Sequence, residues 1–172
     1  ITDGRLRVHT PEGITSLELV GPHNALNLAG AMALAEKWGV PPSDFLNTVQ
    51  DFTGAAGRLE RKLDIPYPDG DSTVFRDFAH APSKVSATTQ SVRTQFHDRK
   101  LIAVLELHTF SSLNPNFLPT YAGALDAADE AWVCFSPDVL AHKQLPPLSI
   151  DIVQDAFKNK AVKVATSAEE IG

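Results

Sequence analysis

Strand-like and helix-like segments alternate along the chain after Arg58, and this alternation limits the possible folds most. The strand-like segments are short, apolar and poor in charge, at 74–77, 101–107, 131–135 and 162–165. The helix-like segments lie between them, at 82–96, 115–127, 137–142 and 151–159. Charge-poor strands are typical of parallel sheets that are buried on both faces. The pattern therefore predicts an α/β fold with a mostly parallel sheet flanked by helices.

The region before Arg58 has a different pattern. Two short strands are expected at 5–9 and 16–20, joined by a turn at 11–13. An Ala- and Leu-rich helix at 24–38 follows, and a second helix runs from Pro42 to about Phe52. A further, antiparallel strand is expected at 59–65, and the chain then turns back through residues 66–71. We place the domain boundary near 58–62, which gives domains at 1–60 and 61–172.

Composition excludes several classes of protein. The net charge is −6, with acidic and basic residues interspersed, which argues against nucleic acid as a partner. The longest apolar run, at 101–105, is too short to cross a membrane. No His or Cys spacing resembles a metal site, so we predict no metal ligands. Cys134 is the single cysteine and lies in an apolar strand, which predicts a buried structural thiol.

The run Gly21-Pro22-His23-Asn24-Ala25-Leu26-Asn27 leads a loop into a helix. A helix start exposes unpaired N–H groups and a positive dipole end, which suit phosphate and ribose groups. Asn24 and Asn27 share a helix face, with His23 four residues before Asn27. Asn24 also fits a helix cap, whereas Asn27 lies too deep for capping. Its amide offers a donor and an acceptor, which can bind the edge of adenine.

Polar loops follow the predicted parallel strands at 78–81, 108–114 and 136–138. Ligands of open α/β sheets bind at this carboxyl edge. Asp77 can accept both hydroxyls of a ribose, and His80 can reach a phosphate or ribose oxygen. Taken singly, Asp77 also fits a helix cap and His80 an exposed loop residue. Because both residues lie at the same strand–helix junction, a binding site is as well supported as the cap and the exposed loop residue.

Three runs resemble the Mur ligases, the ATP-dependent amide-forming enzymes of peptidoglycan synthesis. They occur in order and at sensible spacing, at 21–27, 52–60 and 77–82. The resemblance implies that 1–60 is the end of a central ATP-binding domain and that 61–172 is a Rossmann-like C-terminal domain. The residues expected to bind ATP are His23, Asn24, Asn27, Arg58, Asp77 and His80. Gly57 stands where the family often has the first of two arginines, which leaves that contact to Arg58.

Within the family, the segment 105–113 is informative about the amine substrate. The L-alanine-adding enzymes carry an arginine-bearing Pro-His-Arg-type segment here, whereas this chain has Thr109 and Ser112. The chain is therefore more similar to the muropeptide ligases of peptidoglycan recycling. Those enzymes join the tripeptide L-Ala-γ-D-Glu-meso-diaminopimelate to UDP-N-acetylmuramate. The residues expected to bind this substrate are His108, Thr109, Ser111 and Ser112.

The resemblance also implies a cytoplasmic enzyme that works through an acyl phosphate with ATP and Mg²⁺. The sequence contains no Gly-x-x-x-x-Gly-Lys-Ser/Thr phosphate loop. We therefore expect the triphosphate, the magnesium ion and the UDP group to be held by other domains of a longer protein. Residues 1–172 alone should be inactive and contribute no catalytic residue.

Three alternatives remain open at this stage. Two are related ligases, the L-alanine-adding enzyme and a folylpolyglutamate synthase-like enzyme. The third is a non-catalytic α/β binding module.

Overall fold

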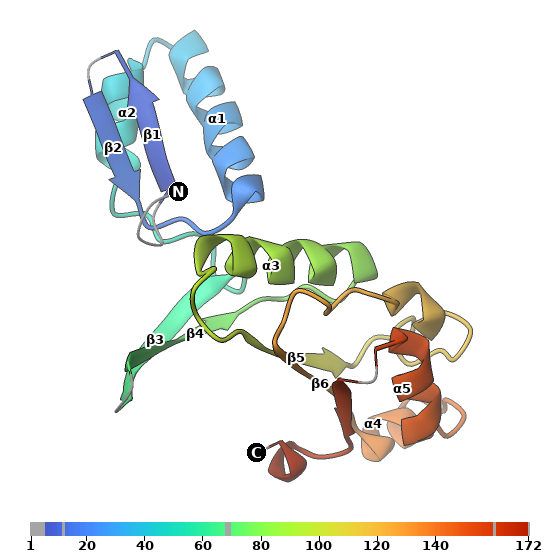
Figure 1. Cartoon of the computed structure of the whole chain (residues 1–172). Coiled ribbons are helices and arrows are strands. Elements are labelled where there is room, and N and C mark those ends of the chain that lie inside the picture. Colours follow the sequence, from blue (N-terminus) through green and yellow to red (C-terminus); the bar gives the residue numbers. More distant parts are fainter. Residues whose placement is uncertain (1–5, 12, 68–69, 160, 172) are drawn as a thin grey trace. The chain divides into compact units, whose positions relative to one another are not determined.

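The computed structural model describes residues 6–11, 13–67, 70–159 and 161–171 (Figure 1). The chain divides into two compact units. The first comprises the residues up to 78 together with 94–97, and the second comprises 79–93 and the residues from 98 onward. Each unit is described by itself below. The predicted domain boundary after residue 60 stays a prediction.

The first unit opens with the antiparallel hairpin of β1 (Leu6–Thr10) and β2 (Gly13–Leu17). The helices α1 (Pro22–Lys37) and α2 (Pro42–Val49) pack against it (Figure 1). Their common core consists of Leu17, Leu19, Leu28 and Leu46. The second strand begins three residues earlier than predicted, because Thr10 pairs directly with Gly13 across a tight turn.

Glycines set both ends of α1. Gly21 is the N-cap with φ 87°, a conformation that costs glycine little, and Pro22 follows at the first helical position. At the other end, the Gly39 N–H donates to the Glu36 carbonyl and the Val40 N–H to the Ala35 carbonyl. This pair of bonds is a Schellman motif. The helix therefore begins two residues before the predicted start at Asn24.

A second hairpin joins β3 (Glu60–Tyr67) to β4 (Gly70–Arg76). It confirms the antiparallel strand predicted at 59–65. The segment 74–77 was expected to open the parallel series, and this expectation is wrong, because β4 pairs with β3 from Gly70 to Arg76. Pairing with a strand that is joined by a short turn costs little loop-closure entropy.

The second unit is built on the parallel sheet β5 (Ile102–Leu107), β6 (Glu130–Phe135) and β7 (Val162–Ala165), in that order. Its helices include α4 (Pro137–His142) and α5 (Ile150–Phe157), and α3 (Pro82–Gln95) precedes β5 (Figure 1). Two short 3₁₀ turns complete it, η1 (Leu118–Tyr121) and η2 (Ala168–Glu170). The predicted α/β fold with a parallel sheet flanked by helices is confirmed.

The sheet buries one face more completely than the other. Leu105, Leu107, Val133 and Phe135 pack with Phe157 of α5 in the core. On the other face of β5, Ile102 and Val104 are 54% and 57% exposed. The expectation that these strands are buried on both faces is therefore wrong for β5.

The predicted helix at 115–127 is also wrong. Only η1 is helical there, and turns continue to residue 127. Pro119 lacks a donor for a helical ladder, and Gly123 adopts φ 76°. The segment still buries Leu118, Tyr121 and Leu125 in the core. The spacing of its apolar residues therefore indicates which side chains pack in the core, and does not indicate a helix. Among the described residues, none of the helices has the length and apolar content needed to cross a membrane.

Candidate functional site

The start of α1 presents the predicted nucleotide-binding residues. Asn24 donates from Nδ2 to the Val20 carbonyl at 2.8 Å, and Gly21 caps the helix without a side-chain bond. The alternative that Asn24 caps the helix is therefore wrong. The side chain of Asn27 is exposed and has no hydrogen-bond partner in the described part of the chain. Its amide is thus available to a ligand.

Gln95 holds this helix start in place. The N–H of Gly21 donates to Gln95 Oε1 at 3.1 Å, and Gln95 is only 5% exposed. The bond satisfies one of the donors that a helix start leaves unpaired. Sequence reasoning missed Gln95, because the two residues lie 74 positions apart and no local pattern joins them.

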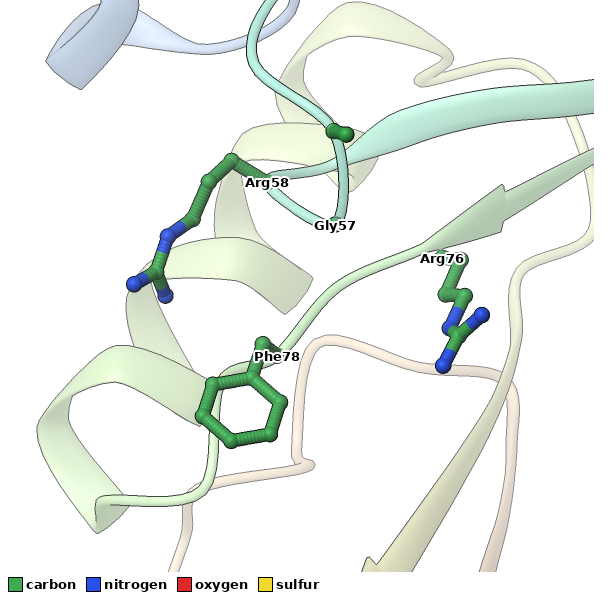
Figure 2. Close-up of a pocket in the computed structure, with 5 residues that line it drawn as sticks. Gly57, Arg58, Arg76 and Phe78 are labelled. Atoms are coloured by element: carbon green, nitrogen blue, oxygen red, sulfur yellow. The ribbon is translucent and has the colours of Figure 1, made fainter.

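A pocket of about 270 Å³ lies beside the segment that follows α2 (Figure 2). Its lining residues are Ala56, Gly57, Arg58, Arg76 and Phe78. The Arg58 guanidinium carbon lies 5.8 Å from the centroid of the Phe78 ring, and the two arginine side chains extend on either side of Phe78 in Figure 2. Two guanidinium groups beside an aromatic ring can hold an anion attached to a planar group.

Backbone contacts fix the shape of this pocket. The Phe78 N–H donates to the Gly57 carbonyl at 2.9 Å, and the Gly57 N–H donates to Glu60 Oε2 at 2.8 Å. A hydrogen bond from Lys62, together with the Gly57 N–H, lowers the pKa of Glu60 and keeps it ionised. Gly57 itself has φ 67°, a backbone conformation that glycine adopts at little cost. Asp77 is half-buried and adjoins two of the lining residues, Arg76 and Phe78, in sequence.

In the second unit, His80 and His108 come together at the carboxyl edge of the sheet. Their ring centroids lie 6.3 Å apart in an edge-to-face arrangement. The Tyr121 hydroxyl donates to the His80 carbonyl, and Tyr121 is fully buried and stacked on Phe157. Burial raises the pKa of Tyr121, so its hydroxyl remains a donor. The core therefore holds the backbone of His80 beside His108.

The loop after β5 is closed by its own hydroxyl groups. The N–H and the Oγ1 of Thr109 each donate to Ser112 Oγ at 2.9 Å. In return, the Ser112 N–H donates to Thr109 Oγ1, and Ser112 Oγ donates to the Thr109 carbonyl. Ser112 is 2% exposed, whereas Ser111 is exposed and His108 is half-buried.

The four predicted substrate residues thus occupy different positions. His108 and Ser111 are accessible, and the hydroxyl groups of Thr109 and Ser112 are engaged within the loop. Their role in substrate binding stays a prediction. His80, which was predicted to bind ATP, lies with His108 of the substrate set, and its contact with ATP also stays a prediction.

Within the described ranges, Cys134 and the acidic residues do not form a metal site. The described residues include no group of three or more His, Cys, Asp or Glu side chains placed to hold a metal ion. Cys134 is half-buried rather than fully buried, and burial, followed by the charge of Glu106, raises the pKa of its thiol.

The described residues form an α/β chain with an arginine-lined pocket in one unit and a histidine pair at the sheet edge of the other. No protein-family model matches the chain. Over 169 residues it is 36% identical to a UDP-N-acetylmuramate–L-alanine ligase of Paenarthrobacter aurescens, which covers 96% of this chain and 35% of that protein. The chain spans 18% to 35% of the length of the curated relatives it matches.

Solved structures show the same fold. The chain is similar to the UDP-N-acetylmuramate–alanine ligase MurC of Thermotoga maritima, with a TM-score of 0.64 and 22% identity over 88% of this chain and 30% of that one. It is also similar to a murein peptide ligase of Psychrobacter arcticus, with a TM-score of 0.53 and 22% identity over 99% of this chain and 36% of that one. The sequence relatives and the shared fold together show that the chain belongs to the Mur ligase family.

Proposed function

We propose that this chain is the C-terminal part of an ATP-dependent ligase that joins a murein tripeptide to UDP-N-acetylmuramate. The observation that carries the proposal is the histidine pair His80 and His108 beside a loop that lacks arginine. Several neutral donors suit a peptide that is anchored at many points. A lone L-alanine carboxylate is better served by a fixed positive charge on the loop.

The reaction has two steps in this proposal. The muramyl carboxylate attacks the γ-phosphorus of ATP, which forms an acyl phosphate and releases ADP. The amine of the tripeptide then attacks the acyl carbon, and inorganic phosphate leaves as the amide forms. Catalysis of this kind depends mainly on positioning and on neutralising charge.

The residues of this chain hold the reactants in defined roles. The exposed amide of Asn27 binds the adenine edge, with His23 and Asn24 beside it at the start of α1. Asp77 accepts the ribose hydroxyls, and Arg58 contacts the ribose or a phosphate from the pocket that it lines. His108 faces the tripeptide, and His80, whose ring lies beside it, contacts a phosphate or ribose oxygen of ATP. Mg²⁺, when bound, neutralises the phosphate charge and is held mainly by residues of the longer protein that lie outside 1–172.

The proposal includes the setting of the enzyme. The longer protein is cytoplasmic, contributes to cell-wall biogenesis through peptidoglycan recycling, and so supports cell shape and division. Residues 1–172 are inactive without its central and UDP-binding domains.

A second candidate is the ligase that adds L-alanine to UDP-N-acetylmuramate. One observation favours it, the 36% identity to such an enzyme over 96% of this chain.

Two substitutions in the full-length protein test the nucleotide part of the proposal. Asn27→Ala and Asp77→Ala each remove one hydrogen-bonded contact to ATP, which typically contributes about 1–3 kcal/mol. We expect each to raise the KM for ATP by about 5- to 150-fold, as that energy range implies. Steady-state measurement of ATP-dependent amide formation gives this constant.

Asn47→Ala and Asp51→Ala are matched controls, since both residues are exposed and lie elsewhere in the same unit. They should leave the KM for ATP unchanged. An unchanged constant in a folded Asn27 or Asp77 variant would remove that residue from the site. Absence of any ATP-dependent amide formation by the wild type would overturn the function itself.

A further inference from the structure

The start of α1 is not fixed by a cap of its own. Gly21 occupies the N-cap position with φ 87° and ψ 151°, and it offers no side chain to the first turn. Glycine adopts many backbone conformations at similar cost, so the direction in which the chain enters the helix depends on other contacts. Those contacts decide where the side chains of the following turns lie, and Asn27 is among them.

A capping box is one common way to fix a helix start, and here its parts come from different elements. In a capping box, the side chain at the third helical position accepts a hydrogen bond from the N–H of the N-cap residue. That position is Asn24, whose Nδ2 donates to the Val20 carbonyl instead. The Gly21 N–H donates to Gln95 Oε1. Gln95 therefore supplies from α3 the acceptor that the third residue of α1 would supply in a capping box.

The side chain of Gln95 is itself held in place. Gln95 is the last residue of α3 and is buried. The next residue, Phe96, packs its ring against Phe75 of β4, with the ring centroids 5.6 Å apart. Gly21, Phe75, Gln95 and Phe96 all belong to the first compact unit. An acceptor whose rotamer is locked by packing holds its donor more precisely than a mobile surface group does.

The bond between Gly21 and Gln95 is buried, which makes its loss costly. A buried donor that loses its acceptor keeps the full cost of its lost hydration. Without the acceptor, the backbone of Gly21 would therefore shift to recover a partner, and the first turns of α1 would shift with it. A side chain that has to meet one edge of a ligand tolerates a displacement of only about 0.5 Å.

We propose that Gln95 is a positioning residue for the nucleotide. Through the Gly21 N–H it holds the start of α1 so that Asn27 meets the edge of adenine. The proposal rests on the proposed function, which assigns adenine to Asn27. It adds a residue that lies 74 positions from Gly21 in the sequence and that affects the nucleotide without touching it.

The test measures the binding of ADP and of GDP to the full-length protein by calorimetry, together with the KM for the tripeptide. Gln95→Met removes the acceptor and nearly keeps the length of the side chain. Gln95→Glu keeps an acceptor, and the positive end of α1 suits its charge. Thr89→Val is the matched control, because Thr89 is also buried in α3 and its Oγ1 donates to the Val85 carbonyl within that helix.

We expect Gln95→Met to raise the Kd for ADP by about 5- to 10-fold, the loss typical of one buried hydrogen bond. The Kd for GDP should rise less, because Asn27 binds the edge of adenine, so the preference for ADP narrows. Gln95→Glu should stay within about threefold of wild type, and Thr89→Val should leave both constants unchanged. The KM for the tripeptide should change by less than about twofold in every variant, because the residues proposed to bind it belong to the second unit.

A double variant separates positioning from a general loss of stability. When it is combined with Asn27→Ala, Gln95→Met should weaken ADP binding further by less than about twofold, because the group that it positions is already absent. A loss that reflects only a weakened fold would instead add in full to the loss caused by Asn27→Ala.

An unchanged Kd for ADP in folded Gln95→Met would overturn the inference, and so would full additivity with Asn27→Ala. If Gln95→Met does not fold, Gln95→Asn, which withdraws the amide by one methylene group, is measured in its place. The proposed function is judged on the wild type. A wild type that binds ADP but prefers L-alanine to the tripeptide contradicts the tripeptide assignment and leaves the ADP comparison valid, whereas a wild type that binds no ADP overturns both.

Discussion

Glu130 at the start of β6 illustrates how single residues tie this fold together. Its carboxylate accepts hydrogen bonds from Lys163 Nζ at 2.8 Å, Lys100 Nζ at 3.0 Å and Trp132 Nε1 at 3.1 Å. The bond from Lys163, followed by those from Lys100 and Trp132, lowers the pKa of Glu130 to about 2. The carboxylate thereby joins the beginnings of β5, β6 and β7, at the edge of the sheet opposite the histidine pair.

This arrangement predicts a pH-dependent contribution to stability. The folded pKa of Glu130 lies below its ordinary value of 4.5, so the contribution is fully present above about pH 4.5 and is lost as the pH falls toward 2. Glu130→Gln should lower the melting temperature at pH 7, and the difference from wild type should shrink steadily below pH 4.5. Thermal unfolding at several pH values measures this, with Glu36→Gln on the exposed side of α1 as the control.

A difference between Glu130→Gln and wild type that stays constant from pH 7 to pH 2.5 would show that the ion pairs contribute nothing measurable. Exposed ion pairs often contribute little to stability, so the expected difference in melting temperature is small.

At the scale of elements, the loop 108–114 contains two serines in different environments, the buried Ser112 and the exposed Ser111. Ser112→Ala removes the acceptor for the Thr109 N–H inside a buried turn, which should cost about 1–3 kcal/mol of stability. Ser111 is exposed, so Ser111→Ala should change stability by less than about 0.5 kcal/mol. If Ser111 contacts the amine substrate, its variant should instead raise the KM for that substrate.

Urea unfolding and steady-state kinetics of the two single variants measure these effects. The interpretation fails if Ser112→Ala is as stable as wild type, or if Ser111→Ala is the less stable of the two.

Elements with strong local signals could be predicted from the sequence. The parallel strands β5, β6 and β7 are short, apolar and poor in charge, and α1 ends where Gly39 allows a left-handed turn. The segment 115–127 misled the prediction, because its apolar residues pack in the core from turns rather than from a helix. The segment 74–77 was assigned to the parallel sheet because it is short and apolar, although the turn predicted at 66–71 leads to it directly from the strand with which it pairs.

At the scale of the whole chain, the residue types of the candidate site were visible in the sequence but their contacts were not. The sequence predicted that the loops of His80 and His108 lie together as the ends of two parallel strands. The two rings do lie together, but β4 pairs antiparallel with β3, and the Tyr121 hydroxyl holds the His80 backbone instead. Arg76 and Gln95 were missed. Arg76 lines the same pocket as Arg58, and Gln95 accepts a hydrogen bond from Gly21, but both partners lie far away in the sequence, so no spacing pattern marks them.

The central claim is that the protein containing this chain joins a peptide, rather than a single amino acid, to UDP-N-acetylmuramate. The most direct measurement is a competition reaction with the full-length enzyme, ATP, UDP-N-acetylmuramate, and equal concentrations of L-Ala-γ-D-Glu-meso-diaminopimelate and free L-alanine. Mass spectrometry of the products gives the ratio of the two amides formed. The account predicts that the tripeptide product dominates, whereas equal or greater formation of the L-alanine product would contradict it.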